Sequence, residues 1–470
     1  MNRAIRLGLV LAGALAPACR MAPTYERPKE PLPAAYAGQA AQPAPGASFA
    51  DLPWFELFQD QVLQQLILAG LQANADVQLA ANRVLQTAAQ VGIAKSYESP
   101  SVASNLGATR GIDQSTRALY GTKATPSDQY VVNMGISWEL DFWGKLRSQT
   151  EAARAQFLAS RENQNLVIQG LVTSIAQAYF QLRELDAELD LARSTLGSRW
   201  QSLQLIQLRR EGGVSSMSDV NQAQSLVQSA SVVIPMLEQQ IAQQEGAIDV
   251  LLGRYGDPVP RGLPLDDQRL VVSVPPGLPS DLLERRPDVR MAEQQLVAAN
   301  AQIGVAKAEL FPSIQLTAGN GYASSGLSSL VGPGSKIWNV GAGVTAPIFN
   351  AGRLRTQVRL SELQQQQMVL QYAKAVQQAF NDAATSLVSV QKTRETRIQQ
   401  QDLTATLDKQ VDLANQRFMG GVAAYLEVQD AERAAFDGER NLVQAKRDEL
   451  LAVLALYKAL GGGWTPEGGS

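Results

Sequence analysis

The chain has 470 residues, 45% of them hydrophobic and 18% charged, and a formal net charge of −3. This composition allows a sizeable buried core, and it provides no basic footprint for nucleic acid. Histidine is absent, which removes the commonest general base and every Ser-His-Asp or Cys-His arrangement. We therefore predict a protein that is not an enzyme, with no cofactor and no metal site.

The N-terminus has the layout of a secretory signal over residues 1–18. Two arginines precede an apolar run from Leu7 to Ala18, and small residues lead up to Cys19. A run of about 12 apolar residues is too short to span a bilayer as a helix. Cys19 is the only cysteine and is placed like the acylated first residue of a bacterial lipoprotein. The alternative is a leftover cysteine inside an ordinary cleaved signal.

An internal duplication follows, with an offset of about 210 residues. The segment RREGGVSSMSDVNQAQ at 209–224 matches RFMGGVAAYLEVQDAE at 417–432, and QVGIAKSYESPSV at 90–102 matches QIGVAKAELFPSI at 302–314. Each half therefore uses the same structural unit once. The predicted divisions are a signal peptide (1–18), a lipidated N-terminal arm with an equatorial segment (19–73), a first repeat (74–253), an equatorial linker (254–279), a second repeat (280–461) and a C-terminal tail (462–470).

Each repeat contains one stretch with the clear alternation of a half-buried strand. In Tyr130–Trp143 and Ile337–Phe349 one face is apolar and the other is polar or glycine-rich. Partner strands near 101–110 and 313–322 complete hairpins over 101–143 and 313–349. Four strands cannot close a barrel, and an open edge is not tolerated in lipid, so the barrel must be shared between chains. A soluble sandwich is the alternative, but it would bury the face that is polar here.

Long helices follow the hairpins. Residues 145–211 and 350–419 contain no proline and are rich in helix-forming residues, so each predicts a rod of about 100 Å. Glycine pairs end the two rods, and return helices are predicted over 217–253 and 424–461. The glycines are Gly212, Gly213, Gly420 and Gly421.

Several local motifs then resemble one known family over nearly the whole chain. They are PTYERP at 23–28, WELDFWGKLR at 138–147, LPSDLLERRPDVR at 278–290, AELFPSI at 308–314 and YKALGGGW at 457–464. Together with the duplicated plan, they resemble the TolC-type outer-membrane efflux proteins, most closely the OprM-like lipoprotein branch.

The resemblance implies an α+β membrane protein that assembles as a homotrimer. Four strands per chain would form a 12-stranded β-barrel in the lipid of the outer membrane, continued by a long α-helical barrel in the periplasm, with a mixed equatorial domain. A periplasmic adaptor (membrane fusion protein) and an inner-membrane pump of the resistance-nodulation-division class would dock below. The implied function is passage of drugs and other small molecules; type I protein secretion or metal-ion efflux are the alternatives.

The resemblance also implies a periplasmic gate at the helix turns. Glu427 and Asp430 occupy positions of acidic rings, Leu426 that of an apolar ring, and Asp219 is their counterpart in the first half. Alternatively, acids in a first helical turn serve the helix dipole, and Ser216-x-x-Asp219 reads as a capping box.

The turns at Gly212, Gly213, Gly420 and Gly421 would be the adaptor-docking sites. Phe418 and Ala423 replace a tyrosine and an arginine that latch the aperture in TolC, so a latch in this chain must differ.

The sequence disfavours two other classes of protein. A lipid-anchored periplasmic hydrolase is disfavoured, because the sequence contains no P-loop, no Gly-x-Ser-x-Gly elbow and no histidine. A coiled-coil lipoprotein would explain the long helices but not the four amphipathic strands.

Overall fold

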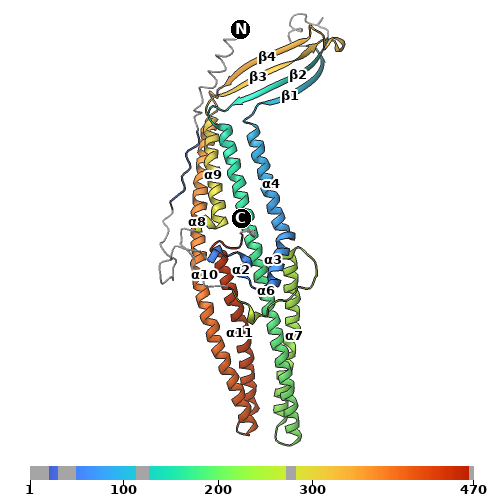
Figure 1. Ribbon diagram of the computed structural model, residues 1–470, viewed down its shortest axis with the longest axis vertical. Helices are drawn as coiled ribbons and strands as arrows, with labels where there is room; N and C mark the ends of the chain where they lie inside the picture. The colour runs from blue at the N-terminus through green and yellow to red at the C-terminus, as the bar shows by residue number, and fades with distance from the viewer. Residues whose placement is uncertain (1–20, 30–48, 113–125, 271–281, 465–470) are drawn as a thin grey trace. The chain divides into compact units, whose positions relative to one another are not determined.

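The computed structural model describes residues 21–29, 49–112, 126–270 and 282–464 (Figure 1). Cys19 and the predicted signal segment lie outside these residues. The chain divides into two compact units. Unit 1 comprises residues 1–29, 83–160 and 291–372, and unit 2 comprises residues 30–82, 161–290 and 373–470.

The described residues are mainly helical. The helices are α2 (Trp54–Leu57), α3 (Gln61–Ala73), α4 (Ala75–Ser96), α6 (Lys145–Glu211), α7 (Met217–Leu252), α8 (Leu282–Arg285), α9 (Pro287–Ala308), α10 (Arg353–Met419) and α11 (Tyr425–Ala459). Short 3-10 helices occur at η1 (Phe49–Asp51), η3 (Leu265–Asp267) and η5 (Leu327–Ser329). Among the described residues, none of the helices combines the length and the apolar character that a membrane-spanning helix needs.

Unit 1 contains one antiparallel sheet with the strand order β1-β2-β3-β4 (Figure 1). The strands are β1 (Ser101–Gly111), β2 (Ser127–Leu140), β3 (Ser313–Ser324) and β4 (Lys336–Thr345). Strands β2 and β3 join the two hairpins, and Leu140 lies opposite Ile314.

The apolar face of this sheet is uncovered by the described part of the chain. Met134 is 59% exposed, Trp338 is 74% exposed and Val340 is 76% exposed. A soluble sandwich would bury such side chains, because their removal from water is the main driving force for packing a sheet. The exposed apolar face therefore argues against the sandwich alternative.

Strand β4 is shorter than the alternation predicted. The predicted strand ran to Phe349, but β4 ends at Thr345, which pairs with Ser313 at the start of β3. Beyond Thr345 there is no further residue of β3 to pair with, and Pro347 has no N–H to donate. Alternation in the sequence predicts which side chains share a face of a strand. Where the strand ends depends on how far its partner strand extends.

The two long helices, α6 and α10, contain 67 residues each and contribute to both units. Helix α6 spans the residues expected for it. Helix α10 begins three residues later than expected, because Ala351 and Gly352 have positive φ angles of 51° and 83° and so form a turn.

The N-terminal arm is held on α9 within unit 1. The Arg27 guanidinium donates to both carboxylate oxygens of Glu293, from Nε to Oε1 and from Nη2 to Oε2, at 2.7 Å each, and the Tyr25 hydroxyl donates to the same carboxylate at 3.2 Å. The Asn300 side chain donates to the Pro23 carbonyl at 2.8 Å. This strap fixes the chain just after the predicted lipid-attachment residue.

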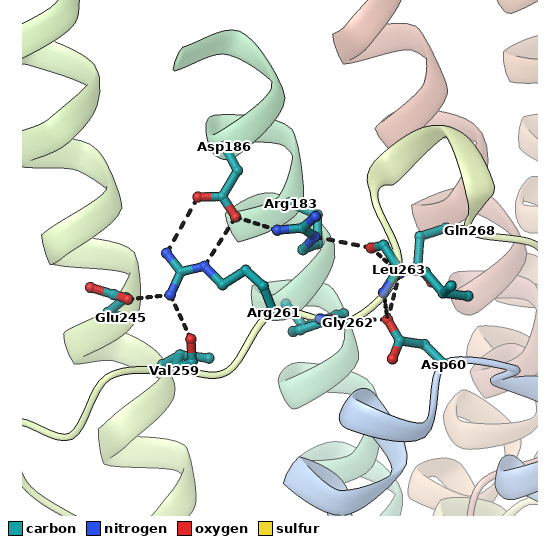
Figure 2. A network of polar contacts seen from close by, with 10 residues as sticks. Asp60, Arg183, Asp186, Glu245, Val259, Arg261, Gly262, Leu263 and Gln268 are labelled. Carbon is teal, nitrogen blue, oxygen red and sulfur yellow. Dashed lines mark hydrogen bonds and ion pairs between the residues drawn. The ribbon is translucent and has the colours of Figure 1, made fainter. Parts of the chain in front are cut away.

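Unit 2 contains a buried carboxylate, that of Asp60, which is 2% exposed (Figure 2). Asp60 caps α3 and also accepts hydrogen bonds from the Tyr179 hydroxyl at 2.8 Å and the Leu263 N–H at 2.9 Å. The Gln268 side chain donates to it at 2.7 Å. These donors connect α3, α6 and the loop after α7, so one side chain fixes three segments.

A second part of the network holds the same loop on α6 and α7 (Figure 2). Arg261 pairs with Asp186 of α6 at 3.1 Å and with Glu245 of α7. Arg183 donates to the Leu263 carbonyl at 3.0 Å. The loop is therefore attached by charged as well as neutral hydrogen bonds.

Candidate functional site

The two glycine turns have the same hydrogen-bonding pattern. In the first, the N–H groups of Gly213 and Val214 donate to the carbonyls of Arg210 and Arg209. In the second, the N–H groups of Gly421 and Val422 donate to the carbonyls of Phe418 and Arg417. Both are Schellman motifs, and the positive φ of Gly213 (77°) and of Gly421 (74°) explains why glycine is needed there.

The two turns lie at the end of one packed cluster in unit 2. The first helix pair is α6 with α7, and the second is α10 with α11. Residues from all four helices contribute to the cluster, so the two pairs contact each other next to their turns. The buried members are Leu203, Ile206, Val220, Ala223, Val227, Ala414, Phe418, Tyr425, Val428 and Ala431.

Asp219 has the capping role that its sequence position suggested as the alternative. Its carboxylate accepts from the Ser216 N–H at 2.8 Å, and its own N–H donates to the Ser216 hydroxyl at 3.2 Å. This reciprocal pair is a capping box at the start of α7. The geometry accounts for Asp219 without a role at an aperture.

Glu427 occupies the matching position of α11 but has a different partner. The N-cap of α11 is Ala424, which makes no side-chain cap, so no capping box forms. Instead, the Glu427 carboxylate pairs with Arg417 of α10 at 3.0 Å. Both side chains are about half exposed, at 47% and 48%, so the pair bridges the second turn at its surface.

Leu426 and Asp430 lie on the exposed face of α11. They are four residues apart, so they lie on one side of the helix. Leu426 is 51% exposed, and Asp430 is exposed with no hydrogen bond or ion pair to any described residue. Both side chains are therefore accessible near the tip of the second helix pair, and Asp430 has no polar partner among the described residues.

Phe418, which stands where TolC has a latch tyrosine, takes part in a contact between the two helix pairs. The Arg209 guanidinium of α6 lies over the Phe418 ring of α10, 5.0 Å from its centroid, and Phe418 packs edge-on against Tyr425 at 5.2 Å. A cation over an aromatic face is attractive without an ion pair. This contact therefore holds the first pair to the second.

Sequence reasoning did not assign roles to Arg209 and Arg417. The duplication contained a usable signal, because both arginines precede a glycine pair at the same position of the repeat. The partner of Arg209 could not be read from the sequence, because Phe418 belongs to the other helix pair. Among the described residues, no group of three or more acidic or cysteine side chains could hold a metal ion.

Comparison with known proteins identifies the fold. Residues 66–254 and 278–462 match the family described as outer membrane efflux protein. The toluene efflux pump outer membrane protein TtgF of Pseudomonas putida is 38% identical, over 98% of this chain and 96% of its own length. The cation efflux system protein CusC of Escherichia coli is 34% identical, over 95% and 96%.

A solved structure agrees with these sequence matches. The open state of the MtrE outer membrane channel of Neisseria gonorrhoeae is 30% identical and covers 95% of this chain and 99% of its own, with a TM-score of 0.85. The predicted fold class, an α+β membrane protein with a trimeric β-barrel continued by a long α-helical barrel, is thereby confirmed. The chain belongs to the family of outer membrane efflux proteins.

Proposed function

We propose that this chain is the outer-membrane channel of a tripartite efflux pump, a passive duct that opens at the tips of its helix pairs. The observation that carries the proposal is the four-stranded sheet. Its apolar face is exposed, and β1 and β4 stand at its two ends in the chain. Because open edges are not tolerated in lipid, the edges need strands from other copies.

Three copies would give twelve strands, in line with the family fold. Native mass spectrometry of the detergent-solubilised protein should therefore find three chains per particle. A stable monomer that inserts into membranes would contradict the trimer.

The partners in this proposal are a periplasmic adaptor at the turns of Gly212, Gly213, Gly420 and Gly421, and an inner-membrane pump of the resistance-nodulation-division class. Relatives named for toluene and cation efflux support small-molecule cargo. Hydrophobic compounds are the first candidate, because TtgF has the higher identity, and metal ions are the second. Type I protein secretion has no support from these relatives.

Complementation tests the efflux function. A host lacking its own outer-membrane channel should regain tolerance to organic solvents and antibiotics when it expresses this chain with its cognate pump and adaptor. Restored tolerance to copper or silver alone would favour the cation alternative. No gain in any of these assays, despite correctly assembled trimers, would contradict an efflux role.

Lipid attachment at Cys19 is part of the proposal. The residue follows the signal segment, and the strap from Pro23 to Arg27 on α9 would hold the chain just beyond it. Cys19→Ser should abolish labelling with radioactive palmitate but leave the trimer intact, because the shared barrel supplies the main membrane anchor. Labelling that persists in the variant would exclude Cys19 as the lipidated residue.

A further inference from the structure

A buried arginine connects the two helix pairs of unit 2 above their turns. Arg199 of α6 is 5% exposed. Its Nη1 donates to the Leu226 carbonyl of α7 at 3.1 Å, and its guanidinium lies 5.4 Å from the ring centroid of Phe436 of α11. Arg199 therefore contacts its own return helix and the return helix of the second pair.

The polar groups around Arg199 are incompletely hydrogen-bonded. Arg199 Nε, Tyr425 Oη and Glu432 Oε2 are buried and have no hydrogen-bond partner among the described residues. Arg199 attracts Glu432 electrostatically, yet no ion pair joins them in the described part of the chain. Burial raises the pKa of Glu432, and the attraction of Arg199 is too weak to cancel that rise.

Such unpartnered atoms are concentrated near the helix tips. Of the eight described side-chain atoms that are buried and unpartnered, six belong to residues 199–222 and 425–432. Among the described residues, Arg254 and Arg440 each contribute one further atom of this kind, but other buried charged groups away from the tips are well satisfied. The buried Asp60 accepts several hydrogen bonds, and Arg286, which is 8% exposed, donates to Asp288, Asp382 and the Ala459 carbonyl. Among the described residues, incomplete hydrogen bonding is therefore most frequent at the tip contact.

We propose that Arg199, Tyr425 and Glu432, here called the tip polar cluster, weaken the contact between the two helix pairs so that it can be separated readily. A buried polar atom without a partner loses its bonds to water and gains none in return. Separation of α6 from α11 would hydrate all three groups. The apolar cluster and the Arg209–Phe418 contact thus stabilise the packed arrangement of the two helix pairs, and the tip polar cluster destabilises it.

The groove next to the cluster gives water a short route to it. The groove has a volume of about 550 Å³ and is lined by Arg199, Glu432 and Phe436, together with Asp408 and Asp412 of α10. A small displacement of α11 would extend this groove to the buried atoms. This inference rests on the proposed opening at the helix tips and identifies what regulates it.

Tyr425→Phe tests the inference with the smallest change. It removes the unpartnered hydroxyl and keeps the ring that packs against Phe418, so it should favour the packed tip by about fivefold or more. The matched control is Tyr179→Phe, because the Tyr179 hydroxyl donates to Asp60 and accepts from the Gly262 N–H. The control should destabilise unit 2 instead.

A second variant replaces the charged members together. Arg199→Met with Glu432→Leu exchanges a buried arginine and a partly buried glutamate for apolar side chains. Replacing poorly paired buried charges in this way often stabilises a protein. It should also favour the packed tip. The double variant changes different atoms from Tyr425→Phe. If one of the two variants fails to fold, the other still tests the inference.

The population of separated tips can be measured with spin labels at Val214 and Val422, which are 67% and 71% exposed, one on each turn. Pulsed electron resonance on trimers diluted with unlabelled chains gives the distance distribution, and planar-bilayer recordings give the conductance. Both Tyr425→Phe and the double variant should increase the short-distance population and lower the conductance.

The outcomes separate this inference from the proposed function. In one outcome Leu426→Ala raises the conductance, but Tyr425→Phe and the double variant leave the distances and the conductance unchanged or increase the separation of the tips. The tip polar cluster then does not weaken the contact between the helix pairs, and the proposed gate at the tips is retained. If no tip variant, including Leu426→Ala, alters conductance, the gate and this inference are both overturned.

Discussion

Glu427 and Asp430 are three residues apart on α11, but their charges have different surroundings. The charge of Glu427 is balanced by Arg417 at 3.0 Å, whereas Asp430 has no partner among the described residues. The family resemblance placed both residues in one acidic gate. The structure distinguishes them, because an ion pair reduces the field that a carboxylate presents to passing ions.

This difference predicts unequal effects on ion selectivity. Asp430→Asn should lower the cation-to-anion permeability ratio clearly, and Glu427→Gln should lower it less. Arg417→Ala should raise the ratio, because it leaves the Glu427 carboxylate unbalanced. Reversal potentials in a salt gradient measure all three. Equal effects of the Asn and Gln variants would show that the ion pair does not screen Glu427.

Asp60 provides a prediction on stability. Burial alone would raise the pKa of Asp60, but hydrogen bonds from Gln268, Tyr179 and two backbone N–H groups outweigh it and lower the pKa below its ordinary value. Asp60→Ala leaves these donors unsatisfied and should destabilise unit 2 by about 3 kcal/mol or more. Thermal unfolding measures the change. Asp257→Ala, an exposed position in the same loop, is the control and should have little effect.

The lowered pKa also gives the sign of a pH effect. A carboxyl whose pKa is lower in the folded state stabilises that state above its unfolded pKa, and the contribution is lost as pH falls through the folded pKa. Hydrogen exchange of the loop at 262–268 should therefore be slow near neutral pH and show loss of protection below about pH 4. Protection that does not weaken in acid would contradict the role of the Asp60 carboxylate.

The two return helices begin differently although they descend from one repeat. Helix α7 has the Ser216–Asp219 capping box, whereas α11 has Ala424 at the N-cap and uses Glu427 for an ion pair. A missing cap costs about 1 kcal/mol, so the first turn of α11 should open more easily than that of α7. The second helix pair is thus the one whose tip is more easily remodelled.

Ala424→Ser tests this difference. The new hydroxyl would accept from the Glu427 N–H as a side-chain N-cap, which should stabilise the first turn of α11 by about 0.5–1 kcal/mol. Hydrogen exchange of residues 425–428 should slow accordingly. Ala423→Ser lies one residue before the cap position and should have no such effect. Equal protection in the two variants would contradict the capping explanation.

Much of this architecture could be predicted from local signals. The absence of proline and the glycine pair at 212–213 predicted α6 over the residues observed, and alternation predicted four strands. The end of β4 could not be predicted, because it depends on where β3 begins to offer partners. The contacts of Arg199 with Phe436 and of Arg209 with Phe418 could not be predicted either. They form only when two helix pairs that are distant in sequence pack together.

For the assembled channel, the central claim is that the helix tips control passage through a trimeric duct. Within one chain, Leu426 is half-exposed and lies one helical turn before Asp430, which has no partner among the described residues. Around a threefold axis Leu426 would therefore form an apolar ring. Truncating it should widen the closed aperture and relieve the exclusion of water that hydrophobic constrictions impose.

The resting conductance of single trimers in planar bilayers tests this claim most directly. Leu426→Ala should raise resting conductance several-fold over wild type, whereas Leu413→Ala, another exposed leucine on the neighbouring helix α10, should leave it unchanged. A Leu426→Ala channel with the conductance of wild type, in trimers that insert normally, would contradict a gate at the helix tips.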